Sequence, residues 1–400
     1  MLRLPRTVVV LGFVSLLNDA ASEMITPLLP IFLTAVLGAG PAIVGLIEGV
    51  AEATASILKL ISGWLADRGL RPKRLVLAGY GTSNVARPLI GLALGWPWVL
   101  AMRFLDRVGK GVRTAPRDAL IAGAVEPERQ GTAFGFHRSM DHAGAVVGPL
   151  IAFALLALAV PLDRVFYWSV IPGMLVLLLL ALGIRSRVPY AQTLRAQTPA
   201  ESKSVSLHWK SLESRLRAVL LASAVLAFAA VPEVFVVLWA SNAGLDLVWI
   251  PLLWAASSGM KMLIAMPSGV LADRIGPMAV LLLGVALRVT ALLLLGGLHA
   301  KGVAVWGLFL MYSASLAVTE PAERGIVGGD APPKLRGTAF GLYHLASGLF
   351  VLPGALAFGV VWQTFSSADA FVLAAIVNVA AAALFWMVAR RPRATVDATA

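Results

Sequence analysis

The chain has 400 residues, of which 59% are hydrophobic and only 14% are charged. Soluble proteins carry roughly a quarter charged residues, so this composition excludes an ordinary soluble domain. The formal net charge of +12 would suggest nucleic-acid binding in a soluble chain. Here its distribution, given below, indicates a membrane protein with no nucleic-acid partner. There are no cysteines, which excludes disulfides and thiolate metal or redox sites.

Apolar segments near 20 residues recur along the whole chain, and each can cross about 30 Å of hydrocarbon. Bounded by Gly, Pro or charge, they predict twelve transmembrane helices. The first follows Arg3 and Arg6 and continues past Asn18 and Asp19 without a convincing cleavage site, so we interpret it as an uncleaved helix rather than a signal peptide. The predicted spans are 7–36, 43–65, 75–94, 97–122, 132–157, 165–183, 217–240, 248–271, 279–298, 303–326, 338–361 and 370–388.

One long polar segment divides the chain. It predicts an N-terminal six-helix bundle at 1–183, a cytoplasmic linker at 184–216, and a C-terminal six-helix bundle with a short basic tail at 217–400.

The two predicted halves repeat each other in sequence. Ser62-Gly63-Trp-Leu-Ala-Asp67-Arg68 recurs 206 residues later as Ser268-Gly269-Val-Leu-Ala-Asp273-Arg274. Gly131-Thr-Ala-Phe-Gly recurs at Gly337 with the same separation. Because each repeat holds an even number of spans, the halves are parallel and related by an axis along the membrane normal, with a site expected at their interface. The fold class is therefore an all-α membrane protein of two pseudo-symmetric six-helix bundles.

Positive charge alternates between the two sets of connections. One set holds only Arg164 and Lys301. Because cytoplasmic loops carry the excess of Lys and Arg, the other set is predicted to be cytoplasmic, with both termini, in the cytoplasmic (inner) membrane. That set holds Arg3, Arg6, Arg68, Arg71, Lys73, Arg74, Arg129, Arg185, Arg187, Arg195, Lys203, Lys210, Arg215, Arg274, Lys334, Arg336, Arg390, Arg391 and Arg393.

The fourth span carries a stripe of charge. On a helix its members fall within about 120° of arc, and a charged side chain facing lipid costs at least ~2.5–3.5 kcal/mol. The stripe must therefore face water, another helix or a substrate, and an anionic substrate, a lipid headgroup or further carboxylates are expected to balance its excess cations. Its members are Arg103, Asp106, Arg107, Lys110, Arg113 and Arg117.

Asp19 and Glu23 lie midway along the first span at i and i+4, so they share a helix face. Carboxylates buried in such a place can exchange protons near neutral pH. Asp19, Glu23 and then Asp106 are the candidates for proton coupling, and the alternative is static neutralisation by the fourth-span arginines.

Further polar residues lie inside predicted spans. His137 and Asp141 are also i, i+4 and could share a proton or hold a divalent metal. The candidate substrate-binding residues are Arg103, Arg107, Lys110, His137, Arg138, Asp141, Glu233, Lys261, Glu320 and Glu323.

Three motifs resemble the major facilitator superfamily. Gly63-x-Leu-Ala-Asp67-Arg68 with the following basic residues resembles the signature loop between its second and third helices. Arg103 with Gly109-x-Gly111 resembles the fourth-helix motif of its proton-coupled drug antiporters, and Pro127-Glu-Arg-Gln-Gly131 resembles the link into its fifth helix. The resemblance covers essentially the whole chain and implies the twelve-helix fold of that superfamily and transport by alternating access.

Two departures from the family pattern matter. Leu70 stands where the signature loop usually has Gly, and the fourth helix carries unusually many charges after its first Arg. The added charges favour a more polar substrate, such as an organic anion, over the usual drug-exporter assignment.

The signature loop predicts a gate between the halves. Asp67 could cap the helix that starts near Gly337, and Asp273 the helix near Gly131, while Arg68 and Arg74 could pair with Asp118. Such contacts would lock the outward-open state. The candidate gating residues are Gly63, Asp67, Arg68, Arg74, Asp118, Gly269, Asp273, Arg274 and Arg324.

The sequence therefore predicts a monomeric secondary transporter without cofactors that exports a small organic solute by proton antiport. Proton-coupled uptake of an organic anion uses the same parts and stays an alternative. Two further alternatives remain. One is a divalent-metal transporter that uses Asp19, Glu23, His137 and Asp141. The other is a membrane enzyme that uses His137 and Asp141 as acid and base. No catalytic motif sits at a credible location, so an enzyme is not expected.

Overall fold

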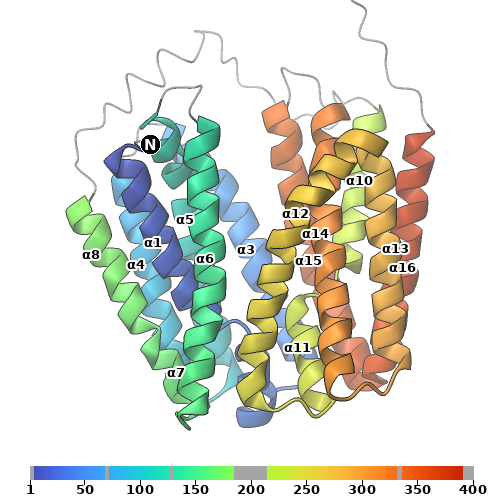
Figure 1. The fold of residues 1–400 in the computed structure, drawn as a ribbon, viewed down its shortest axis with the longest axis horizontal. Helices are drawn as coiled ribbons and strands as arrows, with labels where there is room; N and C mark the ends of the chain where they lie inside the picture. The colour runs from blue at the N-terminus through green and yellow to red at the C-terminus, as the bar shows by residue number, and fades with distance from the viewer. Residues whose placement is uncertain (1–3, 68–71, 126–129, 184–213, 331–335, 391–400) are drawn as a thin grey trace, which may run out of the picture.

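The computed structural model describes residues 4–67, 72–125, 130–183, 214–330 and 336–390, and all structural statements below concern these residues. They are almost entirely helical and form twelve spans in two groups of six, as predicted (Figure 1).

The first group contains α1 to α8. Its helices are α1 (Arg6–Glu23), α2 (Leu29–Ile31), the π-helix η1 (Phe32–Val36), α3 (Pro41–Asp67), α4 (Pro72–Leu89), η2 (Ile90–Leu92), α5 (Trp96–Ala122), α6 (Gln130–Ala157), α7 (Leu162–Trp168) and α8 (Val170–Gly183). The first span is broken after Glu23 because Pro27 and Pro30 have no backbone N–H to donate.

The second group repeats this order. Its helices are α10 (Ser214–Ala229), α11 (Glu233–Asn242), η5 (Leu247–Trp249), α12 (Ile250–Ile275), α13 (Pro277–Gly297), α14 (Val303–Asp330), α15 (Arg336–Thr364) and α16 (Ser367–Ala389). Pro232 breaks its first span, between α10 and α11, much as the prolines break the span begun by α1.

The sequence repeat is also a structural repeat. Ser62 Oγ on α3 donates to the Gly111 carbonyl on α5 at 2.8 Å, and Ser268 Oγ on α12 donates to the Ala317 carbonyl on α14 at 3.3 Å. Donors and acceptors are both 206 residues apart. The two six-helix bundles are therefore related in three dimensions in the register that the sequence predicted.

Nine of the described spans are long and apolar enough to cross a membrane by length and composition. The other three are those of α1, α4 and α5. They carry polar residues that the N-terminal bundle buries, among them Asn18, Arg87, Arg103 and Asp106. The N-terminal bundle thus has a polar interior that ordinary hydropathy does not anticipate.

The bundles meet along two pairs of helices, α3 with α15 and α6 with α12. The α3–α15 contact brings backbone against backbone: a Cβ added at Gly45 would lie 2.2 Å from the Ala355 carbonyl oxygen, and one at Gly359 would lie 2.4 Å from the Pro41 carbonyl oxygen. Small residues permit this approach, as in membrane helix pairs generally.

The apolar packing differs between the two ends of the molecule. We call the end where α1 begins and α16 ends the termini side, and the other end the opposite side. One core joins both bundles near the opposite side, with Met24 and Phe32 from the first and Phe235 and Trp239 from the second. Toward the termini side each bundle has a core of its own. The bundles are thus joined at one end and part toward the other (Figure 1).

Candidate functional site

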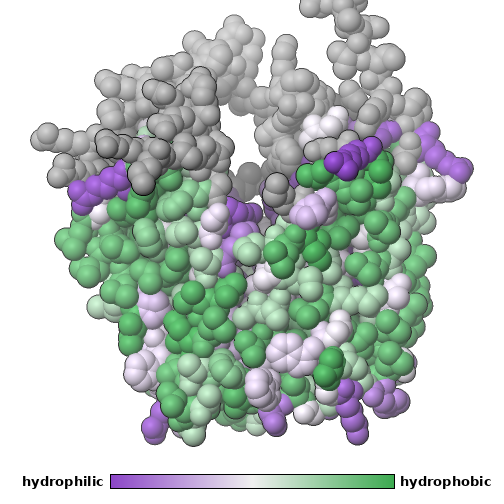
Figure 2. Space-filling model, viewed as in Figure 1, coloured by the Kyte–Doolittle hydropathy of each residue, from purple (hydrophilic) through white to green (hydrophobic). Residues whose placement is uncertain are grey.

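A hollow lies between the bundles and opens toward the termini side, with hydrophilic residues at its edge (Figure 2). Charged residues predicted on the first and fourth spans come together where the shared apolar core begins: Asp19 and Glu23 have Lys110 as a charged neighbour, and Glu23 contacts Trp254 of that core. We call this region the floor of the hollow.

The carboxylates of α1 lie at this floor. Asn18 Nδ2 donates to Asp19 at 3.0 Å. Glu23, the last residue of α1, accepts a hydrogen bond from Trp254 Nε1 of α12 at 2.8 Å. Glu23 therefore contacts the other bundle.

Residues in the N-terminal half of α5 take part in a buried ionic network. Asp106 accepts from Arg87 Nε of α4 at 2.9 Å and lies 3.7 Å from Arg103. Arg103 also donates to Glu48 of α3 at 2.7 Å. Asn18 accepts from Arg87 at 3.0 Å, which ties α1 to the network. Asp106 is 1% exposed and held by two guanidinium groups, so the geometry favours a structural role for it.

Arg107 and Lys110 are only partly buried and lie farther along α5 toward the termini side. Glu52 on α3 is a charged neighbour of both, and Lys110 also has Lys59 and Asp19 nearby. The buried Nε of Arg107 has no hydrogen-bond partner among the described residues.

Two cations of the α5 stripe lie in the C-terminal half of that helix, and one of them contacts α4. Arg113 donates to Ser83 Oγ at 2.6 Å and lies over the ring of Tyr80 at 4.5 Å. Arg117 pairs with its neighbour Asp118 at 2.8 Å. These cations are satisfied within the N-terminal bundle and do not face the hollow as a continuous row.

The expected balance for the α5 cations is supplied at least partly by carboxylates of α3. Glu48 and Glu52 were not singled out from sequence, and neither were Arg87 and Trp254. Glu48 and Glu52 are i, i+4 inside an apolar run, which is the signal that identified Asp19 and Glu23, so the pattern could have revealed them.

His137, Arg138 and Asp141 do form a cluster on α6. His137 Nδ1 lies 3.5 Å from Asp141 and Arg138 lies 3.8 Å from it, while Ser15 of α1 donates to the same carboxylate. Within the described part of the chain, no group of three or more His, Cys, Asp or Glu side chains is placed to hold a metal ion.

The C-terminal bundle contributes a compact pair. Lys261 of α12 donates to Glu233 of α11 at 2.7 Å. The hydroxyl groups of Ser257 and Ser313 donate to the same carboxylate at 3.1 and 3.0 Å. The Lys261 ammonium also lies 5.7 Å from the centre of the Trp254 ring. Lys261 and Trp254 are thus adjacent at the floor of the hollow.

Two more predicted residues lie on α14, farther from that floor. Glu320 pairs with Arg324 of the same helix at 2.6 Å, and their side chains are 58% and 42% exposed. Glu323 has Arg288, Ser223 and Tyr343 around it inside the C-terminal bundle.

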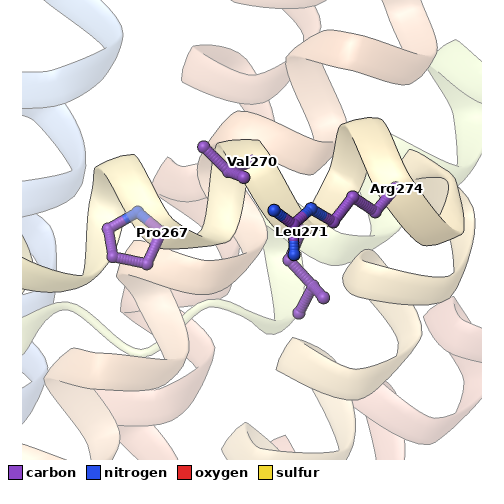
Figure 3. A pocket seen from close by; sticks show the side chains of 4 residues that line it. All are labelled: Pro267, Val270, Leu271 and Arg274. Carbon is purple, nitrogen blue, oxygen red and sulfur yellow. The ribbon is translucent and has the colours of Figure 1, made fainter.

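The predicted gate is only partly visible. Arg68 lies outside the described residues, and so do the surroundings of Gly63 and the side chains of Asp67 and Asp273. Among the others, Arg74 is exposed, and nothing lies within 4 Å of a Cβ added at Gly269. Arg274, Pro267, Val270 and Leu271 line a small open pocket on α12 (Figure 3).

Comparison with known proteins agrees with this architecture. The family model of the Major Facilitator Superfamily matches residues 11–355. The chain is 29% identical over 368 residues to "Uncharacterized MFS-type transporter MJ1317" of Methanocaldococcus jannaschii, covering 90% of this chain and 89% of that protein. It is 33% identical over 140 residues to "Multidrug resistance protein MdtH" of Cronobacter sakazakii, which covers 33% of each chain.

Among solved structures, a bacterial homologue of the human lysosomal transporter Spinster, in an inward-facing and occupied conformation, is similar. Its TM-score is 0.78 at 16% identity, covering 96% of both chains, and this likeness concerns the fold. The family match spans most of the chain and the twelve-helix fold agrees with it. The chain therefore belongs to the Major Facilitator Superfamily and is a secondary transporter that works by alternating access.

Proposed function

We propose that the protein exports a small organic solute in exchange for protons. The observation that carries the proposal is the placement of Asp19 and Glu23. Both are partly buried carboxylates on one face of α1 with Lys110 of α5 as a charged neighbour, and Glu23 accepts a hydrogen bond from the other bundle. A carboxylate that can be reached from alternate sides of the membrane is the usual element of a proton relay.

The substrate site in this proposal lies between Arg107 and Lys110 on one wall and Lys261 on the other. The Lys261 side chain is 29% exposed. Arg103 and Asp106, both buried, position the wall, since each is already paired within its bundle. In this proposal the cluster of His137, Arg138 and Asp141 lies on α6 beside the substrate site. Glu233 holds Lys261 in place.

Asp67, Asp273 and the basic residues of the signature loops are proposed to close the termini side in the alternate state. The positive-inside distribution supports a cytoplasmic location for that side in the inner membrane. In this orientation the present state is open to the cytoplasm. The proposed transporter acts as a monomer.

Exchange rather than uptake is supported by the fourth-helix motif and by the partial similarity to MdtH. Uptake of an organic anion together with protons is a second candidate, because Arg107 and Lys110 are partly exposed cations that would attract a carboxylate or phosphate group.

The first experiment is a thermal-shift screen of purified protein against organic anions, amphipathic cations and divalent metals. Stabilisation by one class of organic solute is expected, and stabilisation by metals alone would overturn the proposed substrate class.

The second experiment uses the stabilising solute in proteoliposomes with an imposed pH gradient. Protons moving in should drive the solute out in the wild type, and Asp19→Asn and Glu23→Gln should retain solute binding but lose this drive. Solute movement in the same direction as the protons would establish the second candidate instead.

A further inference from the structure

The hydrogen bond from Trp254 to Glu23 joins the two bundles at the floor of the hollow. Its partners are 231 residues apart and lie on α12 and α1. Another cross-bundle hydrogen bond joins α3 to α15, where the Ala42 amide donates to Gln363. This bond is 3.3 Å long and exposed. The Glu23 contact is shorter and partly buried, and it involves a side chain proposed to bind a proton.

Trp254 is also part of the apolar seal on the opposite side. Its side chain is in the core shared by both bundles, with the residue only 7% exposed. Its ring meets Phe309 of α14 edge-on, with the centroids 6.4 Å apart. Opening the opposite side requires the two bundles to separate at this core, so it also requires the Glu23–Trp254 bond to break.

The structural repeat explains why Trp254 reaches across. The residue 206 positions before Trp254 is Glu48, and the one before Phe309 is Arg103. In the N-terminal bundle these positions form an ion pair at 2.7 Å, so the two charges are paired within one bundle. At the equivalent positions of the C-terminal bundle, Trp254 and Phe309 form an aromatic pair instead. The indole N–H of Trp254 then donates to Glu23 of the other bundle.

Several charged groups face Glu23 from the elements around it: Asp19 on α1, Lys110 and Arg107 on α5, and Lys261 on α12. An ionised carboxylate accepts a hydrogen bond more strongly than a neutral acid does. The cross-bundle bond is therefore strongest when Glu23 is ionised and weakens when it takes a proton.

We propose that Trp254 is a positioning residue that latches ionised Glu23 and holds the empty carrier closed on the opposite side. A proton on Glu23, or a solute that displaces the indole, releases the latch. The idea rests on the proposed proton exchange and adds the rule that makes exchange obligatory: the carrier without proton or solute cannot reorient.

The test needs no identified solute. Trp254→Phe keeps an aromatic ring but deletes the N–H donor, and Trp249→Phe is the matched control. Trp249 is 44% exposed and packs against Phe153 with the ring centroids 5.7 Å apart. Each variant is reconstituted in liposomes that contain a pH-sensitive dye, and a pH gradient is imposed with no solute present.

Because the latch blocks return of the empty carrier, wild-type liposomes should hold the gradient. The Trp254→Phe variant should dissipate it about tenfold faster, the factor expected for losing one hydrogen bond to a charged group. Trp249→Phe should behave as the wild type. A leak in Trp254→Phe no larger than in Trp249→Phe would overturn the latch.

A second readout follows the opening directly. The chain has no cysteine, so spin labels can be placed at Leu94→Cys and Val303→Cys, which are 101% and 86% exposed and belong to different bundles. Lowering the pH should lengthen the distance between the two labels in the wild type, because a proton on Glu23 releases the latch. The distance should be long at every pH in Glu23→Gln and Trp254→Phe, and the double variant should add nothing beyond Glu23→Gln.

The outcomes separate the two proposals. If Glu23→Gln removes the pH response while Trp254→Phe responds as Trp249→Phe does, the latch is wrong and Glu23 remains the proton carrier. If Glu23→Gln responds to pH as the wild type does, the proton-carrying role of Glu23 fails as well.

Discussion

At the scale of single residues, the N-terminal bundle is unusual for the number of charges it buries. Arg87, Arg103 and Asp106 are each no more than 3% exposed. Such charges are tolerated in a membrane only when they are paired and hydrogen-bonded. Here one carboxylate lies between two guanidinium groups, and a second carboxylate, Glu48, holds the outer one.

Replacing Asp106 with Asn should destabilise the protein strongly, because Arg87 would keep its charge without a compensating anion. Removing one partner of a buried pair costs about 3–5 kcal/mol. Thermal unfolding of the purified protein in detergent measures the loss, with Arg138→Ala as the control, since its side chain is 61% exposed. Equal melting temperatures for the two variants would contradict a buried ionic network.

Replacing Arg103 with Lys should also destabilise, though by less. The guanidinium donates to Glu48 through one nitrogen and approaches Asp106 with another, whereas a single ammonium has no such planar fork. We expect a loss of about 1.5–3 kcal/mol, the size of one hydrogen bond to a charged group. Substituting Arg117, whose ion pair with its neighbour Asp118 joins no second helix, should cost much less in the same melting experiment.

At the scale of elements, the α3–α15 pair is the close contact between the bundles. A Cβ would lie 2.7 Å from the Leu352 side chain at Gly49 and 2.2 Å from Ser56 Oγ at Gly348. Glycines thus allow these helices to touch over several turns, from the opposite side toward the middle of the molecule. Such a contact can serve as a pivot when the bundles rock, because it contains few long side chains that must repack.

The pivot can be tested with matched glycine substitutions. Gly45→Ala would place a methyl group 2.2 Å from a backbone oxygen of α15, which cannot move aside as a flexible side chain can. The control is Gly307→Ala on α14, where an added Cβ meets nothing within 4 Å. Overpacking costs about 1–3 kcal/mol, so Gly45→Ala should melt lower and transport more slowly. Similar behaviour of both variants would indicate that the close approach is unimportant.

At the scale of the whole molecule, the two ends differ because their cores differ. A single apolar core spans both bundles at the opposite side, while separate cores leave the termini side divided. Alternating access requires this arrangement to invert, so the shared core must be able to separate while the bundles keep their own internal packing.

The orientation of this asymmetry in the membrane follows from charge. Arg390, Arg391 and Arg393 follow the last span, whereas the opposite-side connections carry only Arg164 and Lys301. A fluorescent-protein fusion at the C-terminus should therefore fluoresce in bacterial cells, and an alkaline phosphatase fusion there should be inactive. An active phosphatase would reverse the orientation and the proposed direction of export.

The sequence alone determined the twelve-helix class and the two-fold repeat, and it predicted roles for Asp19, Glu23 and the α5 stripe. These conclusions depend on local quantities: the length of an apolar run, the cost of a charge within it, and spacing along one helix. The structure confirmed the fold and the repeat. It leaves the proton-coupling, substrate and gating roles as predictions.

Only the tertiary structure decided which charges meet. It paired Asp118 with its neighbour Arg117, and it brought Glu48 to Arg103 and Arg87 to Asp106. The pairing of Asp118 with Arg68 and Arg74 in the outward-open state stays a prediction, since Arg68 lies outside the described residues. It also singled out Trp254, since a tryptophan in an apolar span carries no signal of its own. Partners between helices are fixed by how the helices pack and rotate against each other, and spacing within one helix cannot supply that information.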